Sequence, residues 1–159
     1  EFEKVIALAE EYALGDFLNY AITWKSLTLA YQEPTAAALE RAKQAIESLR
    51  ATGVTLAMTG LLASLGEVFR LADRCAEGLE TIAEALALIE RTRDRVYETE
   101  LWRIKGELLL KANASNAQAE AESCFQQAIQ IAQRRPRHLS PLRPQDQSQR
   151  AGVGHRNGR

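Results

Sequence analysis

Histidine is almost missing from this sequence of 159 residues: the two present, His138 and His155, lie in the last quarter of the chain. The rest of the chain therefore lacks the imidazole on which most nucleophile–base pairs and many metal sites depend. Proline and glycine are scarce before the last two dozen residues, and β-branched residues are few. Alanine, leucine, glutamate, glutamine and arginine are abundant instead, and all are good helix formers. The composition predicts an all-α fold.

Cysteine is nearly as rare, with only Cys75 and Cys124. Two cysteines make no zinc pattern and are typical of a reducing cytoplasm. Cys75 lies near a predicted helix start, where a thiolate gains some stability, but a small packing residue is the favoured interpretation for it and for Cys124. No signal peptide is evident, and the uncharged run that includes residues 54–66 is too short to cross a bilayer. We predict a cytoplasmic protein.

The charge is divided unevenly along the chain. The net charge is −1, but residues 136–159 carry five arginines and one acid, which gives +4 and leaves −5 for residues 1–135. A body of that charge is a poor nucleic-acid surface, because phosphate binding needs clustered basic residues. We interpret residues 136–159 as an irregular, disordered tail. An alternative is that the tail is a frame-shifted reading of a further helix, which the gene sequence would test.

Apolar residues recur at helical spacing, and turn signals separate the runs. One stripe contains Leu79, Ile82, Ala83, Leu86 and Ile89; a second contains Leu101, Ile104 and Leu108; a third contains Phe125, Ile129 and Ala132. The signals between runs are Gly15-Asp16, Pro34-Thr35, Gly53, Asp73, Asp94 and the capping box of Ser115 and Gln118. Seven helices are predicted: 3–14, 17–32, 35–51, 55–71, 74–92, 95–111 and 116–134. The short connections predict antiparallel neighbours.

The chain also shows an internal repeat. Ser26, Gly66 and Gly106 are separated by 40 residues each, and each lies midway along the first helix of a predicted pair. The second helix of each pair then shows a small–large–small series, with registered positions Ala38, Ala42 and Ala45; Gly78, Ile82 and Ala85; Ala121, Phe125 and Ala128. Small residues facing large ones let two helices pack closely. We therefore predict a repeat domain at 3–135, with pairs at 17–51, 55–92 and 95–134 after a leading helix.

This pattern resembles the tetratricopeptide repeat (TPR). The best matching residues are Leu65, Gly66, Phe69, Gly78, Ile82 and Ala85, and then Trp102, Gly106, Leu109, Ala121, Phe125 and Ala128. The first unit departs from the pattern, with Ser26 for glycine and Ala42 for the large residue. Segments 77–92, 98–110 and 119–132 are further similar to the C-terminal repeats of large bacterial signalling ATPases, some of which carry adenylate-cyclase or transcription-regulator domains. The resemblance implies a right-handed α-solenoid that binds or senses partners.

In a TPR array the first helix of each pair lines a concave groove, so the resemblance implies a binding surface. Its expected residues are Tyr20, Thr23, Leu27 and Tyr31 from the first unit, Gly60, Ala63, Glu67 and Arg70 from the second, and Glu100, Arg103, Glu107 and Lys111 from the third. One end is aromatic, the middle is small and the far end has mixed charge. That gradient suits a peptide or helix of a partner protein. The alternatives are a small ligand between Tyr20, Tyr31, Gly60 and Ala63, or an ordinary solvated surface.

We expect no catalysis, cofactor or metal. Glu98, Glu100 and Glu107 could form a carboxylate site, but they share a helix face only in part and basic neighbours offer them salt bridges. A glycine-rich phosphate loop would need a preceding strand, and none is predicted. The predicted array lacks a polar cap at each end, and such ends expose apolar surface. A homodimer through these ends is therefore a second prediction.

Overall fold

The computed structural model describes residues 1–55, 57–113 and 116–134, and this part of the chain is helical without a strand. The predicted all-α class and the number of helices are confirmed for these residues. The helices are α1 (Phe2–Glu11), α2 (Gly15–Gln32), α3 (Ala36–Ala51), α4 (Met58–Leu71), α5 (Cys75–Thr92), α6 (Glu98–Ala112) and α7 (Ala117–Arg134). The predicted tail at 136–159 and the capping residue Ser115 lie outside the described residues.

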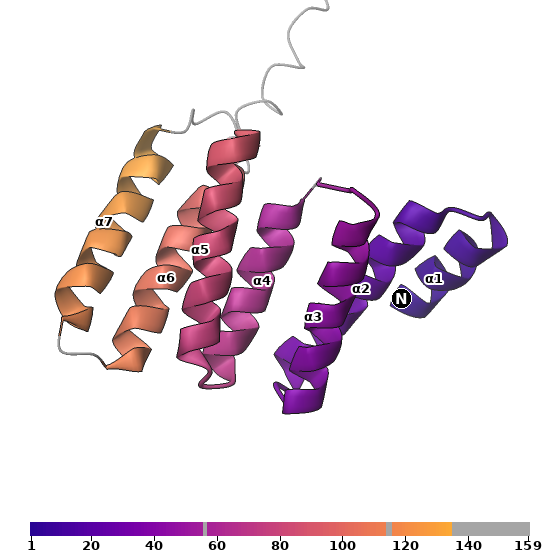
Figure 1. Ribbon diagram of the computed structural model, residues 1–159, viewed down its shortest axis with the longest axis horizontal. Helices are drawn as coiled ribbons and strands as arrows, with labels where there is room; N and C mark the ends of the chain where they lie inside the picture. The colour runs from indigo at the N-terminus through magenta and orange to yellow at the C-terminus, as the bar shows by residue number, and fades with distance from the viewer. Residues whose placement is uncertain (56, 114–115, 135–159) are drawn as a thin grey trace, which may run out of the picture.

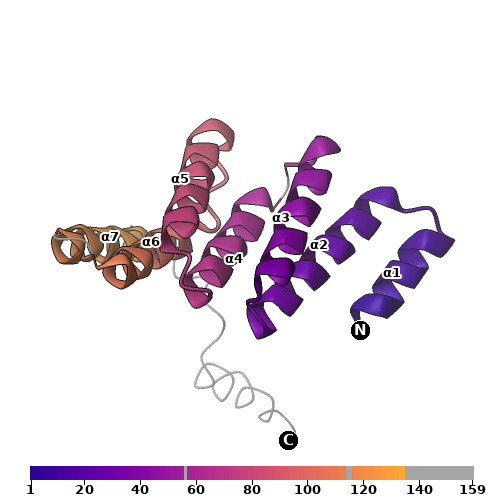
Figure 2. The same ribbon diagram turned by 60° about the horizontal axis from the view of Figure 1, so that its bottom comes forward.

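The helices follow one another in chain order along the long axis of the molecule (Figure 1). Each packs on the next, and α4 also contacts α2 and α6. Among the described residues, no helix contacts another that lies more than two places away in the sequence. Figure 2 shows that the helix direction turns along this row, since α6 and α7 are viewed nearly end-on while α1 to α5 lie across the view.

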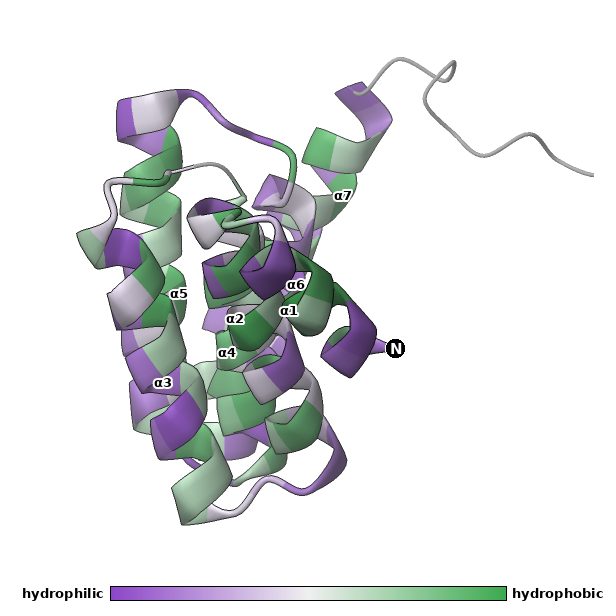
Figure 3. Ribbon diagram, turned by 90° about the vertical axis from the view of Figure 1, so that its right-hand side faces the viewer, coloured by the Kyte–Doolittle hydropathy of each residue, from purple (hydrophilic) through white to green (hydrophobic). Residues whose placement is uncertain are grey.

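The buried faces of the helices follow the spacing of their apolar residues. On α6 the predicted stripe of Leu101, Ile104 and Leu108 is buried. On α5 the buried residues are Gly78, Ile82, Ala85 and Ile89, so the predicted stripe is right at Ile82 and Ile89 and wrong at Ala83, which is exposed. In Figure 3 the ribbon has the colour of hydrophobic residues mainly where helices face each other, and much of α3 has the colour of hydrophilic residues. Helix α4 is the centre of this core: ten of its residues are buried, because neighbours cover it on several sides.

The third predicted stripe is right at Phe125, which is half-buried where it meets Gly106, and wrong at Ile129 and Ala132. Ile129 is 55% exposed and Ala132 is also exposed. The buried face of α7 instead contains Ala121, Cys124 and Ala128. These small residues let α7 lie close to α6, and a helix rotated to bury Ile129 would lose that close approach.

Several helix boundaries differ from the predicted ones because the turns use other residues. Ala13 has φ +53°, and the N–H of Leu14 donates to the carbonyl of Ala9 at 2.8 Å, so α1 closes before Gly15. Gly15 consequently begins α2 and does not end α1. Asp73 has φ +60° and closes α4 in the same way, and the residue that caps α5 is Arg74. Non-glycine residues in this left-handed conformation end helices here in the manner usual for glycine.

Two other predicted signals act as helix boundaries. Thr35 caps α3, since its hydroxyl oxygen accepts from the N–H of Ala38 at 3.2 Å. Pro34 therefore precedes the helix and is outside its first turn. Gly53 follows the end of α3 with φ +79°, a conformation that glycine adopts without steric cost.

The close helix contacts predicted at Gly66 and Gly106 are present. A Cβ atom on Gly66 would lie 2.5 Å from Cδ1 of Ile82, and one on Gly106 would lie 2.6 Å from Cε1 of Phe125. In each pair the glycine of one helix meets the large residue of the next. Only glycine allows the two helix backbones to approach this closely without a shift.

Candidate functional site

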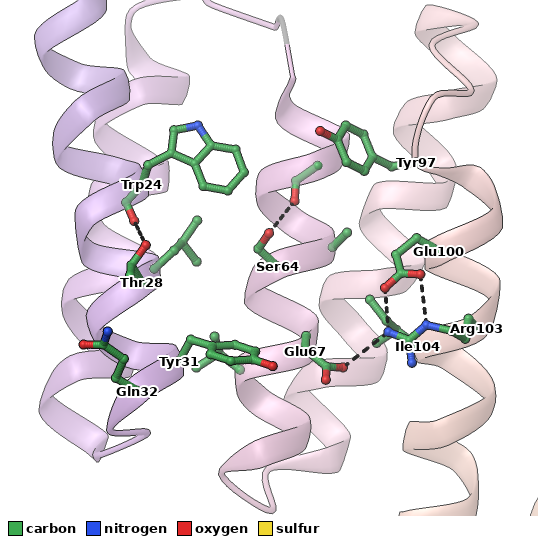
Figure 4. A pocket seen from close by; sticks show the side chains of 14 residues that line it. Trp24, Thr28, Tyr31, Gln32, Ser64, Glu67, Tyr97, Glu100, Arg103 and Ile104 are labelled. Atoms are coloured by element: carbon green, nitrogen blue, oxygen red, sulfur yellow. Dashed lines mark hydrogen bonds and ion pairs between the residues drawn. The ribbon is translucent and has the colours of Figure 1, made fainter. Parts of the chain in front are cut away.

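A cleft of about 510 Å³ lies along α2, α4 and α6. Helix α4 lies between the other two and forms the floor (Figure 4). The lining residues are Trp24, Leu27, Thr28, Tyr31 and Gln32 from α2, Gly60, Ala63, Ser64, Glu67 and Val68 from α4, and Tyr97, Glu100, Arg103 and Ile104 from α6 and the residue before it. The cleft exists because the floor is built from small side chains while the walls carry large ones.

Gly60 determines how one wall meets the floor. A Cβ atom at this position would lie 2.6 Å from two atoms of the Tyr97 ring. The ring therefore rests directly on the backbone of α4, and any other residue at position 60 would displace it. This contact joins the turn before α6 to the helix at the centre of the core.

Aromatic side chains enter the cleft from both sides. Trp24 points in from α2, and Tyr97 points in from the opposite wall (Figure 4). Tyr31 extends from α2 toward Glu67 and is 56% exposed. Trp24 and Tyr97 are each half-buried. Two rings are thus fixed by packing, and the third is open to a ligand.

The other end of the cleft is charged. Arg103 donates from Nε to Glu100 at 2.9 Å and from Nη2 to the same carboxylate at 2.5 Å. Its Nη1 donates to Glu107. Arg70 donates from Nε and Nη2 to Glu67 at 2.9 and 2.6 Å, and its Nε lies 3.2 Å from Glu107. These five side chains form one network that joins α4 to α6.

This network shifts the proton affinity of its members. Hydrogen bonds from Arg70 lower the pKa of Glu67 below its ordinary 4.5, against an opposing effect of burial. Glu67 in turn raises the pKa of Arg70, and Glu100 does the same for Arg103. All three groups are therefore charged at neutral pH.

The lowered pKa of Glu67 predicts a dependence of stability on acid. The stabilisation by its charge is complete above about pH 4.5, the ordinary value, and is lost as the pH falls through the lower folded-state pKa. Glu67→Gln should therefore lower the free energy of unfolding at neutral pH by about 1 kcal/mol or less. On acidification, this variant should lose less stability than the unchanged chain does. Urea unfolding followed by circular dichroism at several pH values measures both. Glu122→Gln, outside the network on α7, is the control; an equal acid response in the two variants would contradict the prediction.

The structure brings together seven of the twelve predicted groove residues. Leu27, Tyr31, Gly60, Ala63, Glu67, Glu100 and Arg103 line the cleft. Arg70 and Glu107 lie beside it in the charged network. Lys111 is further away, where it donates to the carbonyl of Arg70 at 2.6 Å and pairs with Asp73.

Two predicted residues of α2 face the core or α3 and do not line the cleft. Thr23 is 1% exposed and its hydroxyl donates to the carbonyls of Asn19 and Ala45, so it joins α2 to α3. Tyr20 is half-buried against the core, and burial raises its pKa. On α2 the cleft is lined by Trp24, Thr28 and Gln32 together with the predicted Leu27 and Tyr31.

Seven lining residues were not expected from the sequence: Trp24, Thr28, Gln32, Ser64, Val68, Tyr97 and Ile104. Trp24, Thr28 and Tyr31 have the i, i+4, i+7 spacing of one helix face, and this signal was available. Tyr97 precedes α6, and its place depends on the contact with Gly60. No spacing rule predicts that contact.

The other candidate residues, the carboxylates of α6 and the cysteine of α7, make contacts that hold the structure together. Glu98 is 7% exposed and pairs with Arg95 at 2.7 Å, while Glu100 and Glu107 bind Arg103. Burial raises the pKa of Cys124, which disfavours its thiolate. Within residues 1–55, 57–113 and 116–134, no three histidine, cysteine, aspartate or glutamate side chains gather so that they could hold a metal ion. None of the described helices is both long and apolar enough to span a bilayer.

The fold and the cleft define an all-helical protein whose described part has a groove across three helices, aromatic at one end and charged at the other. Comparison of the chain with protein families, curated proteins and solved structures finds no match. Functional inference therefore depends on the cleft and its residues.

Proposed function

We propose that this chain is a non-catalytic protein-interaction scaffold that holds a peptide segment of a partner in the cleft of α2, α4 and α6. The cleft itself carries the proposal: it crosses three helices, is open along its length and changes from aromatic to charged. Grooves of this kind bind extended or helical peptides through side-chain anchors. Exposed Tyr31, about two helix turns along α2 from the half-buried Trp24, provides the anchor point.

The proposed architecture is a right-handed α-solenoid of three TPR-like pairs, α2–α3, α4–α5 and α6–α7, after the leading helix α1. The equivalent contacts of Gly66 with Ile82 and of Gly106 with Phe125 support a repeated unit. By the sequence resemblance, we assign the chain to the partner- or signal-sensing repeat region of a cytoplasmic bacterial signalling ATPase or regulator.

Replacing Tyr31 should weaken peptide binding without disturbing the fold. Peptides selected from a random display library on the immobilised chain are measured by fluorescence anisotropy. Tyr31→Ala should raise their Kd about tenfold, since an aromatic anchor contributes 1 kcal/mol or more to an interface. Phe17→Ala is the control, because Phe17 is an aromatic residue of the same helix, is 67% exposed and lies outside the cleft. Its Kd should equal that of the unchanged chain.

Equal binding by Tyr31→Ala and Phe17→Ala would contradict the proposed site. A selection that enriches no peptide would contradict the scaffold function and favour a small-molecule sensor. The cleft volume of about 510 Å³ lies within the range of small-ligand sites. A ligand of that kind would raise the melting temperature of the chain, and this increase would be lost in Tyr31→Ala.

We also propose that the chain forms a homodimer through its end helices. Val5, Leu8 and Tyr12 are 48%, 53% and 65% exposed and follow i, i+3, i+7 along α1. They form an apolar stripe that no described helix covers, whereas the exposed face of α7 is mainly polar. Light scattering after size exclusion should give a dimer mass that Leu8→Glu reduces to a monomer. Gln126→Glu, on α7, is the control. A monomer at high concentration would contradict the proposal.

A further inference from the structure

Four polar side chains of the cleft present only acceptor oxygens to a ligand. The hydroxyl of Thr28 donates to the carbonyl of Trp24 at 2.8 Å, and that of Ser64 donates to the carbonyl of Gly60 at 3.0 Å. A hydroxyl has one proton, so both oxygens retain only lone pairs for a ligand. Glu67 and Glu100 add carboxylate oxygens, which accept hydrogen bonds and do not donate them.

The strongest donor in the cleft is already engaged. Arg103 uses Nε and Nη2 for Glu100 and Nη1 for Glu107. These bonds use three of the five N–H groups of the guanidinium, and an anion that reached the other two would lie beside the carboxylates of Glu100 and Glu107, which repel it. The charged lining residues are Glu67, Glu100 and Arg103, two acids and one base, so the cleft has a formal charge of −1. Both features disfavour an anion.

The aromatic rings of the cleft are also available to a cation. Elsewhere the protein covers two of its rings with its own basic groups: Lys105 lies 5.0 Å from the centroid of Trp102, and Arg74 lies 5.3 Å from that of Phe69. In the described part of the chain, no such pair involves Trp24, Tyr31 or Tyr97. Their faces can attract a positive group of a ligand.

We propose that the cleft binds a basic side chain of the partner peptide, arginine in preference to lysine, between Trp24, Tyr31 and Glu67. This inference depends on the proposed function, because it names the anchor of the peptide bound there. A guanidinium is planar and rich in donors, so it stacks on aromatic rings while its N–H groups reach acceptor oxygens. Figure 4 shows Tyr31 extended toward Glu67 along this path, with Trp24 on the same wall.

The test uses N-acetyl-arginine methylamide as the probe, with the glutamate and leucine analogues for comparison. The full chain has two tryptophans, so its NMR spectrum has two indole N–H signals, which Trp102→Phe assigns. The arginine probe should shift the Trp24 signal with a millimolar Kd. The glutamate and leucine probes should bind at least about fivefold more weakly. Added salt should weaken the binding of the arginine probe.

Three variants test which residues bind the arginine probe. Tyr31→Ala should weaken binding of the arginine probe about fivefold and Glu100→Gln about threefold, while Phe17→Ala, outside the cleft, should leave its Kd unchanged. The proposal is overturned if the arginine probe shifts no signal, if the glutamate probe binds as well, or if Tyr31→Ala has no effect. Selected peptides that bind the cleft without a basic anchor would also overturn it, and the scaffold function would stand. Conversely, binding of the probe without any selected peptide would support the cation site and count against the scaffold function.

Discussion

Replacing Phe69 with alanine should lower the free energy of unfolding by about 3–5 kcal/mol, because the ring is lost from a core that cannot close over the cavity. Phe69 is the largest of the fully buried side chains in the described part of the chain, with 2% exposure. It lies on α4, the helix with neighbours on several sides. The free energy of unfolding of natural domains is about 5–15 kcal/mol, so this change removes a large share of it. Urea unfolding followed by far-UV circular dichroism measures it.

Phe17 provides the matched control for this substitution. It is 67% exposed on α2, so Phe17→Ala deletes the same atoms without opening a cavity. Its effect on unfolding should be within about 0.5 kcal/mol of zero, as for most surface substitutions. Similar losses in the two variants would show that α4 is not the centre of the core.

A methyl group at position 66 should also destabilise the protein, although alanine favours helix more than glycine does. The added Cβ would lie 2.5 Å from Cδ1 and 3.0 Å from Cγ1 of Ile82, which is completely buried. Overpacking of this kind costs about 1–3 kcal/mol, whereas the gain in helix propensity is at most about 1 kcal/mol. Gly66→Ala should therefore lower the unfolding free energy and the urea midpoint.

Two comparisons test the cause of that effect. At Gly15 a Cβ atom would meet nothing within 4 Å, so Gly15→Ala should be neutral or stabilising. Ile82→Val removes Cδ1, the atom nearest the new methyl group, and the double variant with Gly66→Ala should be more stable than the two single effects predict. Simple additivity would mean that Gly66 and Ile82 do not meet.

The sequence predicted the fold well where it depends on helix period and residue size. The buried stripes of α5 and α6 follow from their spacing, and Gly66 and Gly106 were correctly placed against large partners. The boundaries were harder: Ala13 adopts a positive φ that alanine rarely adopts, and Asp73 has a positive φ where a helix N-cap was predicted. Tertiary packing imposes that conformation, so no local signal marks it.

The cleft was predictable only in part, for a geometric reason. In a row of packed helices, each helix turns part of its surface to the neighbour on either side and part to the solvent. Successive residues lie about 100° apart around the helix, so an error of one residue assigns a side chain to the wrong part. Thr23 was expected in the groove and instead hydrogen-bonds the carbonyl of Ala45 of α3, whereas Trp24 lines the cleft. The charged end was predicted better, since Glu100 and Arg103 are three residues apart and pair within one helix.

The contacts between helices have a consequence for how the chain folds. Because no described helix contacts another more than two places away, every contact closes a short loop, and short loops have a low entropic cost. Proteins rich in such local contacts reach the native state quickly. Folding can therefore start at α4 and α5, around Phe69, and extend by one helix at a time toward either end. Helix α1, which contacts only α2, can open and close while the rest of the chain stays folded.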